Sequence, residues 1–305
     1  MLWAPPATVE AELFSAMPAA FRRPGVRTDW ADANRGGAAV DSFLEGPAFD
    51  REGFLLVTDI PFGRIFRIAP DGTWSLVVEY EGWPNGLKLH REGWAAVTDY
   101  RRGVLRLDPR RAVLEPLVTH RFSEGFRGVN DCVFSSGGDL YFTDQGQTGL
   151  HDPTGRVYRY TAAGRLDCLL TTVPSPNGIV LAPDEKALFV AATRGNAVWR
   201  GPIMADGTLS KVGVFASLYG PTGPDGLAMD EAGNLVVAHP GGDSVWLFSP
   251  RGEPVLRVRC ADGDFPTNVA HGGPDRRSLY ITCSGAGVVR CAAMPVPGRR
   301  LFSHA

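Results

Sequence analysis

The feature that most constrains the fold is a series of six oxygen-bearing side chains, each of which opens a short apolar segment. The series consists of Glu45, Asn85, Asn130, Asn177, Asp225 and Asn268, with 40 to 48 residues between neighbouring members. In three repeats Pro precedes and Gly follows: Pro84-Asn85-Gly86, Pro176-Asn177-Gly178 and Pro224-Asp225-Gly226. A strand-rich repeat of roughly 40–50 residues is typical of a β-propeller, in which every repeat forms one blade. The sequence therefore predicts an all-β, six-bladed propeller.

Each repeat contains enough strand-forming segments for a four-stranded blade. In the first repeat a short segment at 47–49 is followed by 54–59, 64–68 and 74–78, which are rich in β-branched and aromatic side chains. Turns containing Gly or Asp separate these segments, and short strands joined in this way pair as antiparallel neighbours. We therefore expect four antiparallel strands per blade, with blades starting near residues 45, 85, 130, 177, 225 and 268.

The sixth repeat lacks a clear fourth strand, so another part of the chain has to complete it. The segment Val9–Phe14 is the favoured candidate, because a strand from before the first repeat would close the ring and remove exposed edges. Arg300–Ser303 is the alternative. The prediction is a single propeller domain over residues 1–305, in which residues 15–44 approach over one face.

Composition narrows the class of protein only a little. The net charge of −2 gives no reason to expect nucleic acid or an anionic membrane as a partner, and no obligatory protein partner is evident. The N-terminal region has no long apolar run, so neither a signal peptide nor a membrane span is expected. Five cysteines without a CxxC spacing favour a reduced, cytoplasmic setting. A bridge between Cys283 and Cys291 is left open.

Equivalent positions of all blades meet around the axis of a propeller, so the six oxygen-bearing groups should converge on one channel. Asn or Asp beside Gly also forms ordinary turns, which is the simpler interpretation of any single copy. Glu45 and Asp225, however, replace the amide by a charge. Two carboxylates aimed at one channel repel each other unless a cation lies between them. Ligands that are all oxygen suit Ca²⁺, Mg²⁺ or Mn²⁺, so the sequence predicts a site for a hard divalent cation.

A second repeated position follows the first by about fourteen residues and is Asp59, Asp99, Asp144 and His239 in four of the repeats. Thr precedes the Asp in three of them. Such a pair at the end of a strand usually caps local backbone N–H groups, which is the interpretation favoured for Asp59 and Asp99. Asp144 and His239 lead into Gly-rich segments that could form one rim of the channel.

These segments resemble the senescence marker protein (regucalcin)/gluconolactonase family of six-bladed propellers. The matching stretches are Glu45-Gly46-Pro47, Asn130-Asp131 ahead of Gly138–Asp144, Pro176–Ile179 and Pro224–Ala228, and the likeness extends from about residue 40 to 292. Members of this family are divalent-metal lactonases. The resemblance implies that Glu45, Asn177 and Asp225 hold the metal, that Asn130 contacts substrate or metal-bound water, and that Arg127 holds substrate oxygens.

The chemistry expected from this resemblance is hydrolysis of a sugar-derived lactone. A hard cation can polarise the ester carbonyl and activate water, while a carboxylate takes the proton from the attacking water. Asp225 is the favoured general base and Glu45 the alternative. Ca²⁺ is the favoured ion, with Mg²⁺, Mn²⁺, Fe²⁺ and Zn²⁺ left open. Gln145 and Gln147 would suit a hydroxylated ring. His239 or His271 could pass a proton to the leaving hydroxyl, although a surface or turn position is the favoured interpretation of both.

Three other functions are compatible with parts of the pattern. The same Lewis acid could serve an esterase or a phosphotriesterase. A propeller could also be a non-catalytic binding scaffold with a structural metal, because fold alone does not determine function. A condensing enzyme similar to strictosidine synthase would work without metal, and the carboxylates at 45 and 225 argue against it. The chain has no G-x-S-x-G or H-E-x-x-H motif that would indicate a different hydrolase.

Overall fold

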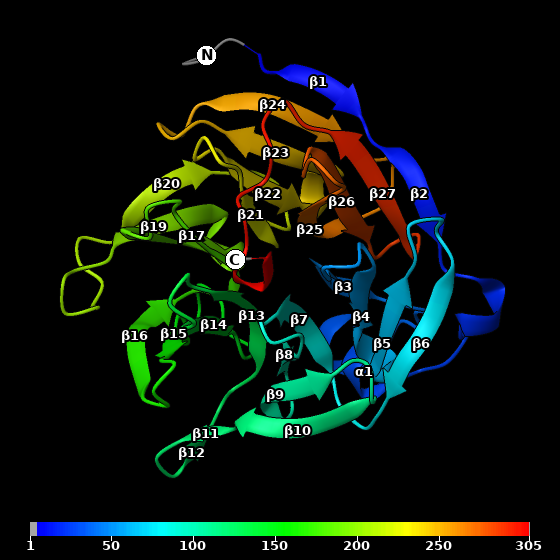
Figure 1. Cartoon of the computed structure of the whole chain (residues 1–305), viewed down its shortest axis with the longest axis horizontal. Helices are drawn as coiled ribbons and strands as arrows, with labels where there is room; N and C mark the ends of the chain where they lie inside the picture. The colour runs from blue at the N-terminus through cyan, green and yellow to red at the C-terminus, as the bar shows by residue number, and fades with distance from the viewer. Residues whose placement is uncertain (1–4, 305) are drawn as a thin grey trace.

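Six blades, each a sheet of four antiparallel strands, are arranged around a central axis in the computed structural model, which describes residues 5–304 (Figure 1). The predicted six-bladed propeller is therefore confirmed, with β3, β7, β13, β17, β21 and β25 as the inner strands. The predicted domain 1–305 also includes residues 1–4 and 305, which lie outside the described residues.

The first three blades are regular four-stranded meanders. They consist of β3 (Leu44–Phe49), β4 (Leu55–Asp59), β5 (Arg64–Ile68) and β6 (Trp74–Glu79); β7 (Pro84–Leu89), β8 (Ala95–Asp99), β9 (Gly103–Asp108) and β10 (Val113–Val118); and β13 (Val129–Phe134), β14 (Leu140–Asp144), β15 (Gly155–Tyr160) and β16 (Leu166–Val173). A small hairpin of β11 (His120–Arg121) and β12 (Glu124–Gly125) lies between the second and third blades.

The last three blades follow the same plan, with shorter or borrowed strands. They consist of β17 (Pro176–Leu181), β18 (Ala187–Ala192), β19 (Ala197–Pro202) and β20 (Gly213–Ser217); β21 (Leu227–Met229), β22 (Leu235–His239), β23 (Ser244–Phe248) and β24 (Pro254–Arg259); and β25 (Pro266–Gly272), β26 (Ser278–Cys283) and β27 (Val288–Ala293). Apolar side chains of adjacent blades pack together, as Leu56 and Ile65 do with Leu87 and Val97. The core is thus a series of layers between blades.

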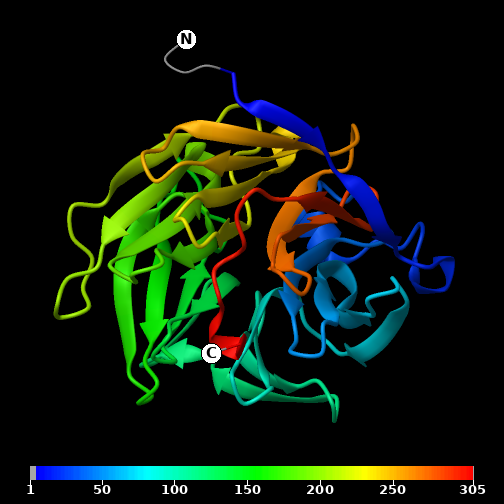
Figure 2. The same cartoon turned by 45° about the horizontal axis from the view of Figure 1, so that its top comes forward.

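The N-terminal region completes the ring, as predicted. Strand β2 (Glu12–Ala16) pairs antiparallel with β27 and supplies the fourth strand of the sixth blade. Strand β1 (Ala7–Glu10) adds a parallel pairing with β24, so the N-terminal region joins the fifth and sixth blades (Figure 2). The parallel pairing was not predicted, because this four-residue segment is exposed throughout and nothing in its sequence specifies β24 as a partner.

The alternative prediction, that Arg300–Ser303 supplies the closing strand, is wrong. The end of the chain instead forms the short 3-10 helix η5 (Phe302–His304), and the C-terminal segment crosses toward the centre of the ring (Figure 1). The Phe302 ring packs against Phe134 and His90 from the second and third blades. The aromatic ring fills apolar space there, which an edge strand could not do.

The six oxygen-bearing residues that open the repeats, from Glu45 to Asn268, are called the axial residues. Glycines that follow them allow the inner strands to approach closely. A Cβ atom on Gly46 would overlap the carbonyl oxygen of Asn85, and one on Gly178 would overlap that of Asp225. The Gly of the repeated motif is therefore required by packing between blades, because the neighbouring strand occupies the space of a side chain.

Threonine hydroxyl groups connect most blades to the beginning of the next blade. The side-chain oxygen of a Thr donates to a backbone carbonyl in the following blade at five of the six junctions. The pairs are Thr58 with Asn85, Thr98 with Asn130, Thr143 with Asn177, Thr193 with Pro224, and Thr267 with Leu44. At the remaining junction the amide of Gly226 donates to the carbonyl of Thr267, at 2.8 Å. The carbonyls belong to axial residues or their neighbours, so these bonds fix the axial residues relative to one another.

The second repeated position is structural. Oδ1 of Asp59 accepts from the amide of Phe43, and Oδ1 of Asp144 accepts from that of Gly128. Asp99 caps the amides of Arg101 and Arg102, as predicted. Asp144 and His239 are fully buried. Of the Gly-rich segments that follow them, 145–149 lines a cavity at one end of the axis, as the sequence had suggested, whereas 240–242 is not part of its lining. The His239 ring is held by the Tyr219 carbonyl and by the Trp246 indole.

The segment between β2 and β3 covers part of one face. It contains the 3-10 helix η1 (Ala19–Phe21) and helix α1 (Asp29–Asn34), whose N-terminus is capped by Thr28. Trp30 and Ala31 of α1 are buried against Ile60, so the helix is docked on the first blade. Short 3-10 turns also occur at η2 (Ile60–Phe62), η3 (Thr193–Gly195) and η4 (Pro240–Gly242). Among residues 5–304, no helix has the length and apolar character needed to cross a membrane.

Candidate functional site

Five of the six axial residues line one cavity of about 710 Å³ at the end of the channel nearest α1. These five are Glu45, Asn85, Asn130, Asn177 and Asp225. Each lies at the start of an inner strand or, for Asp225, just before it. Residues further along the same strands, such as Val180 and Ala228, line a second cavity at the opposite end. The inner strands thus present their polar first residues to one mouth and apolar residues to the other.

Several oxygens in this first cavity are buried without a hydrogen-bond partner among the described residues. They are Oδ1 of Asn85, Oδ1 of Asn130 and Oδ1 of Asp225. A buried acceptor without a donor costs about 1–3 kcal/mol. Three such oxygens around one cavity, close to a second carboxylate, are a donor set that a hard cation satisfies.

Glu45 and Asp225 lie at the buried inner end of this cavity, its floor, where their surroundings disfavour the ionised carboxylate. Burial raises the pKa of Glu45 to about 7, with the charge of Asp131 adding to the shift and a hydrogen bond from Asn268 opposing it. Burial also raises the pKa of Asp225 well above its ordinary value, and the charges of Glu45 and Asp131 push it in the same direction. Three carboxyl groups share the axis, so a cation bound there would stabilise their ionised forms.

The sixth axial residue, Asn268, lies deeper and connects two of these carboxylates. Its Nδ2 donates to Oε2 of Glu45 at 2.9 Å and to Oδ2 of Asp131 at 3.3 Å. Lys88 Nζ lies 3.8 Å from Oδ1 of Asp131. The sequence placed Asn268 in the axial series without a specific role, and it assigned no role to Asp131 or Lys88. The sequence signal that could have revealed Asp131 was the adjacent polar pair Asn130-Asp131 in an otherwise apolar strand. Because successive side chains of a strand point to opposite faces, these two residues contact different surroundings.

The predicted substrate-binding residues occupy different places. Asn130 lines the cavity, and its Nδ2 donates to Oε1 of Gln145 at 3.1 Å. Arg127 is not among the lining residues: its guanidinium pairs with Thr154 and lies 3.8 Å from Oδ2 of Asp152. Gln145 and Gln147 both line the cavity, consistent with the polar wall expected from the sequence.

The two histidines suggested for proton transfer lie elsewhere. His271 lines the second cavity, where both ring nitrogens are buried without a partner among residues 5–304. Burial lowers its pKa to about 4, so the ring is neutral at physiological pH. His239 is also absent from the first cavity. A direct role for either ring at the axial carboxylates is therefore not compatible with their positions.

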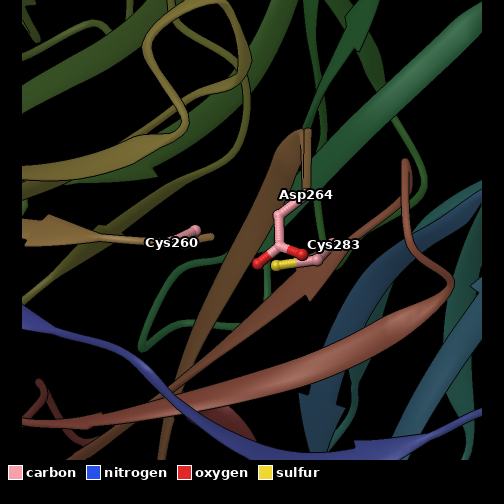
Figure 3. Close-up of side chains that lie close together, drawn as sticks. All are labelled: Cys260, Asp264 and Cys283. Carbon is pink, nitrogen blue, oxygen red and sulfur yellow. The ribbon is translucent and has the colours of Figure 1, made fainter. Parts of the chain in front are cut away.

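A separate cluster of Cys260, Asp264 and Cys283 lies between the fifth and sixth blades (Figure 3). The carboxylate of Asp264 already accepts from Arg290 and from the amide of Ala261. It is therefore neutralised by the protein and needs no cation. All five cysteines are free, and the neighbour of Cys283 is Cys260 rather than Cys291. The sequence did not reveal that Cys260 and Cys283 are neighbours, because the two cysteines belong to different blades.

The fold and the axial oxygens define a class: six-bladed propellers with a carboxylate- and amide-lined site at one mouth of the channel. The pattern of the SMP-30/Gluconolactonase/LRE-like region matches residues 43–285, and the chain belongs to this family. It is 30% identical over 272 residues to a gluconolactonase of Zymomonas mobilis, covering 79% of this chain and 76% of the relative. It is 32% identical over 232 residues to lactonase drp35 of Staphylococcus aureus, covering 70% and 69%. The resemblance inferred from the sequence is confirmed.

Solved structures show the same architecture. A gluconolactonase from Xanthomonas campestris superposes with a TM-score of 0.73 at 21% identity, covering 98% of this chain and 99% of that one. A calcium-binding protein, regucalcin, from Agrobacterium tumefaciens gives a TM-score of 0.73 at 22% identity, covering 86% and 94%. At these sequence identities the similarity shows a shared fold and no more.

Proposed function

We propose that this protein is a divalent-metal-dependent lactonase acting on a sugar-derived lactone. Curated relatives named gluconolactonase and lactonase match most of the chain, which supports the lactonase class. The observation that carries the metal dependence is the set of buried oxygens without partners beside two carboxylates of raised pKa. Glu45, Asn177 and Asp225 would hold the ion, and Ca²⁺ is the ion that this all-oxygen set favours.

A bound cation would supply a Lewis acid for the ester carbonyl and lower the pKa of a water molecule. The residues of this chain supply the rest. Oδ1 of Asp225 has no hydrogen-bond partner among residues 5–304, so it can accept the proton of an attacking water. Glu45 is less suited to that role, because its Oε2 already accepts from Asn268 and from the amide of Gly46. The side chain of Asn130 is held in position by its hydrogen bond to Gln145, and it can orient the lactone oxygens.

The direct test is hydrolysis of a panel of lactones, followed as acid release at constant pH. Protein stripped of metal by a chelator should be inactive, and addition of Ca²⁺, Mg²⁺, Mn²⁺, Fe²⁺ or Zn²⁺ should restore turnover with at least one ion. Aryl esters and a phosphotriester in the same panel test the alternative hydrolases. Lactone opening at the uncatalysed rate with every ion, in protein that binds the ion, would refute the lactonase and leave an esterase or a scaffold.

Stability of the metal-free protein should depend on pH in a way that reports Glu45. The pKa of this group is about 7 in the folded protein, against an ordinary value of 4.5. The folded state therefore retains a proton that the unfolded state has lost, so stability should fall as pH rises from about 4.5 to 7. A divalent ion should abolish this fall, because it stabilises the ionised carboxylates.

The measurement is the melting temperature at several pH values, with chelator and with Ca²⁺. Glu45→Gln is the control that isolates this group, since Asp59, whose pKa burial raises to about 6, also contributes to the pH dependence. The difference between wild type and variant should be largest in the metal-free protein above pH 7. Identical pH profiles for the two proteins would contradict the assignment.

A further inference from the structure

The wall of the site cavity has opposite charges at its two ends. Its carboxylates are Glu45 and Asp225, both at the buried floor. Its cationic side chains are Arg35 and Arg194, both exposed at the mouth. Among residues 5–304, neither guanidinium forms an ion pair or a side-chain hydrogen bond, whereas Arg276 and Arg299 in the second cavity pair with Glu231 and Glu185. The cavity therefore presents free positive charge to whatever part of a substrate points outward.

Arg35 is held in position although it lacks a carboxylate partner. It follows α1, and its amide donates to the carbonyl of Ala31. Its guanidinium lies 5.4 Å from the ring centre of Phe265 and 5.9 Å from that of Phe43, and both rings line the cavity. Stacking on two aromatic rings restrains a guanidinium and leaves its N–H groups available for an anion.

The backbone of Phe265 fixes the position of its ring. Its φ is +56°, a left-handed conformation that is unfavourable for a bulky side chain. The conformation is fixed on both sides, since the Phe265 amide donates to Oδ1 of Asp243 and its carbonyl accepts from Ser284. Ser175, which also precedes the Pro at the start of an inner strand, has the same conformation with a φ of +59°, so this backbone geometry belongs to the repeat. Here the result is an aromatic ring beneath Arg35.

Arg194 approaches the cavity from a different blade. It lies in η3 of the fourth blade, and its side chain packs beside Gly149, which also lines the cavity. Arg194 and Asp225 line the same cavity, so the guanidinium faces the site as well as bulk solvent. A neutral sugar lactone needs no free guanidinium at the outer end, whereas a carboxylate or phosphate there would satisfy one.

We infer that the substrate is an anionic lactone, one that carries a carboxylate or phosphate group on the part of the molecule that faces the mouth, where Arg35 and Arg194 bind it. This inference rests on the proposed lactonase function. The ester end would lie at the axial carboxylates and the anionic end at the guanidinium groups.

The experiment compares gluconolactone with glucarolactone, which carries a carboxylate, and with a phosphorylated gluconolactone. Wild-type protein with metal should show kcat/KM at least about tenfold higher for one of the anionic lactones, because charge-assisted hydrogen bonds are strong. Arg35→Gln and Arg194→Gln should each reduce that preference about tenfold, mainly through KM. Arg251→Gln is the matched control, since Arg251 is exposed on the fifth blade, away from the cavity.

A second readout separates this inference from the lactonase proposal. Calorimetry measures binding of the open-chain acids gluconate, glucarate and phosphogluconate, which requires no turnover. Tighter binding of a dianion that depends on Arg35 or Arg194 supports the anion site, even if no lactone is hydrolysed. Lactonase activity with neutral and anionic lactones equal within twofold, and no effect of either variant, overturns the anion site and leaves the lactonase intact. The phosphate and carboxylate probes identify which anion is bound.

Discussion

Asp225→Asn should lower metal-dependent lactone turnover at least about a hundredfold. The substitution removes a negative charge from the proposed ligand set and the favoured general base in one step, and loss of a single charge-stabilising group typically costs 10²–10³ in rate. The change preserves the shape of the side chain, so the fold should be retained. In the absence of metal the variant should be at least as stable as the wild type, because Asp225 is buried beside Glu45 and Asp131.

Turnover, metal affinity by calorimetry and melting temperature should be measured on the same samples. Asp262→Asn, which changes an exposed carboxylate outside the cavity, is the control and should behave as the wild type. A variant that keeps full turnover would show that Asp225 is neither ligand nor base. One that binds metal normally but is inactive would assign it the role of base alone.

Arg64→Met should destabilise the protein by about 3–5 kcal/mol, the cost of leaving a buried charge without its partner. Arg64 is 2% exposed, and its Nε donates to Oδ2 of the fully buried Asp59 at 2.8 Å. Its Nη1 also donates to the carbonyl of Phe21 at 2.6 Å, which ties the segment before the first blade to that blade. Asp59 in turn holds the amide of Phe43, a residue of the cavity wall.

Unfolding by denaturant measures this effect. Arg110→Met is the matched control, because the Arg110–Glu52 pair is exposed and such pairs contribute about 0–1 kcal/mol. Adding Asp59→Asn to Arg64→Met should recover much of the lost stability, since Asn keeps the acceptor for Phe43 without the charge. A loss below about 1 kcal/mol for the single variant, equal to that of the control, would contradict this account.

The sequence predicted the repeated parts of the structure better than the parts that occur once. The axial series from Glu45 to Asn268 located all six inner strands, because each blade imposes the same local pattern of turn and strand. The closing strand was predicted from the need to cover an edge. The role of Thr58 and its counterparts was missed, since their hydroxyl groups bond to the next blade, a contact that no local pattern reveals.

Residues outside the repeats were the hardest to place. Arg35 lies in a segment with a single short helix, and its position over Phe265 brings together residues 230 positions apart. Arg127 was chosen for its place in the sequence near Asn130, but its guanidinium faces Asp152 and Thr154. Its role in substrate binding remains a prediction of the family resemblance.

The hydroxyl bonds between blades have a geometric consequence. In a closed ring the rotations from each blade to the next must sum to one full turn, so a change at one junction has to be compensated at the others. Because Thr58, Thr143 and Thr193 bond to carbonyls at or beside axial residues, such a change moves the axial oxygens together. A substitution on the outer part of any blade that alters its tilt can therefore change the diameter of the ring of oxygens, and with it the size of ion that fits.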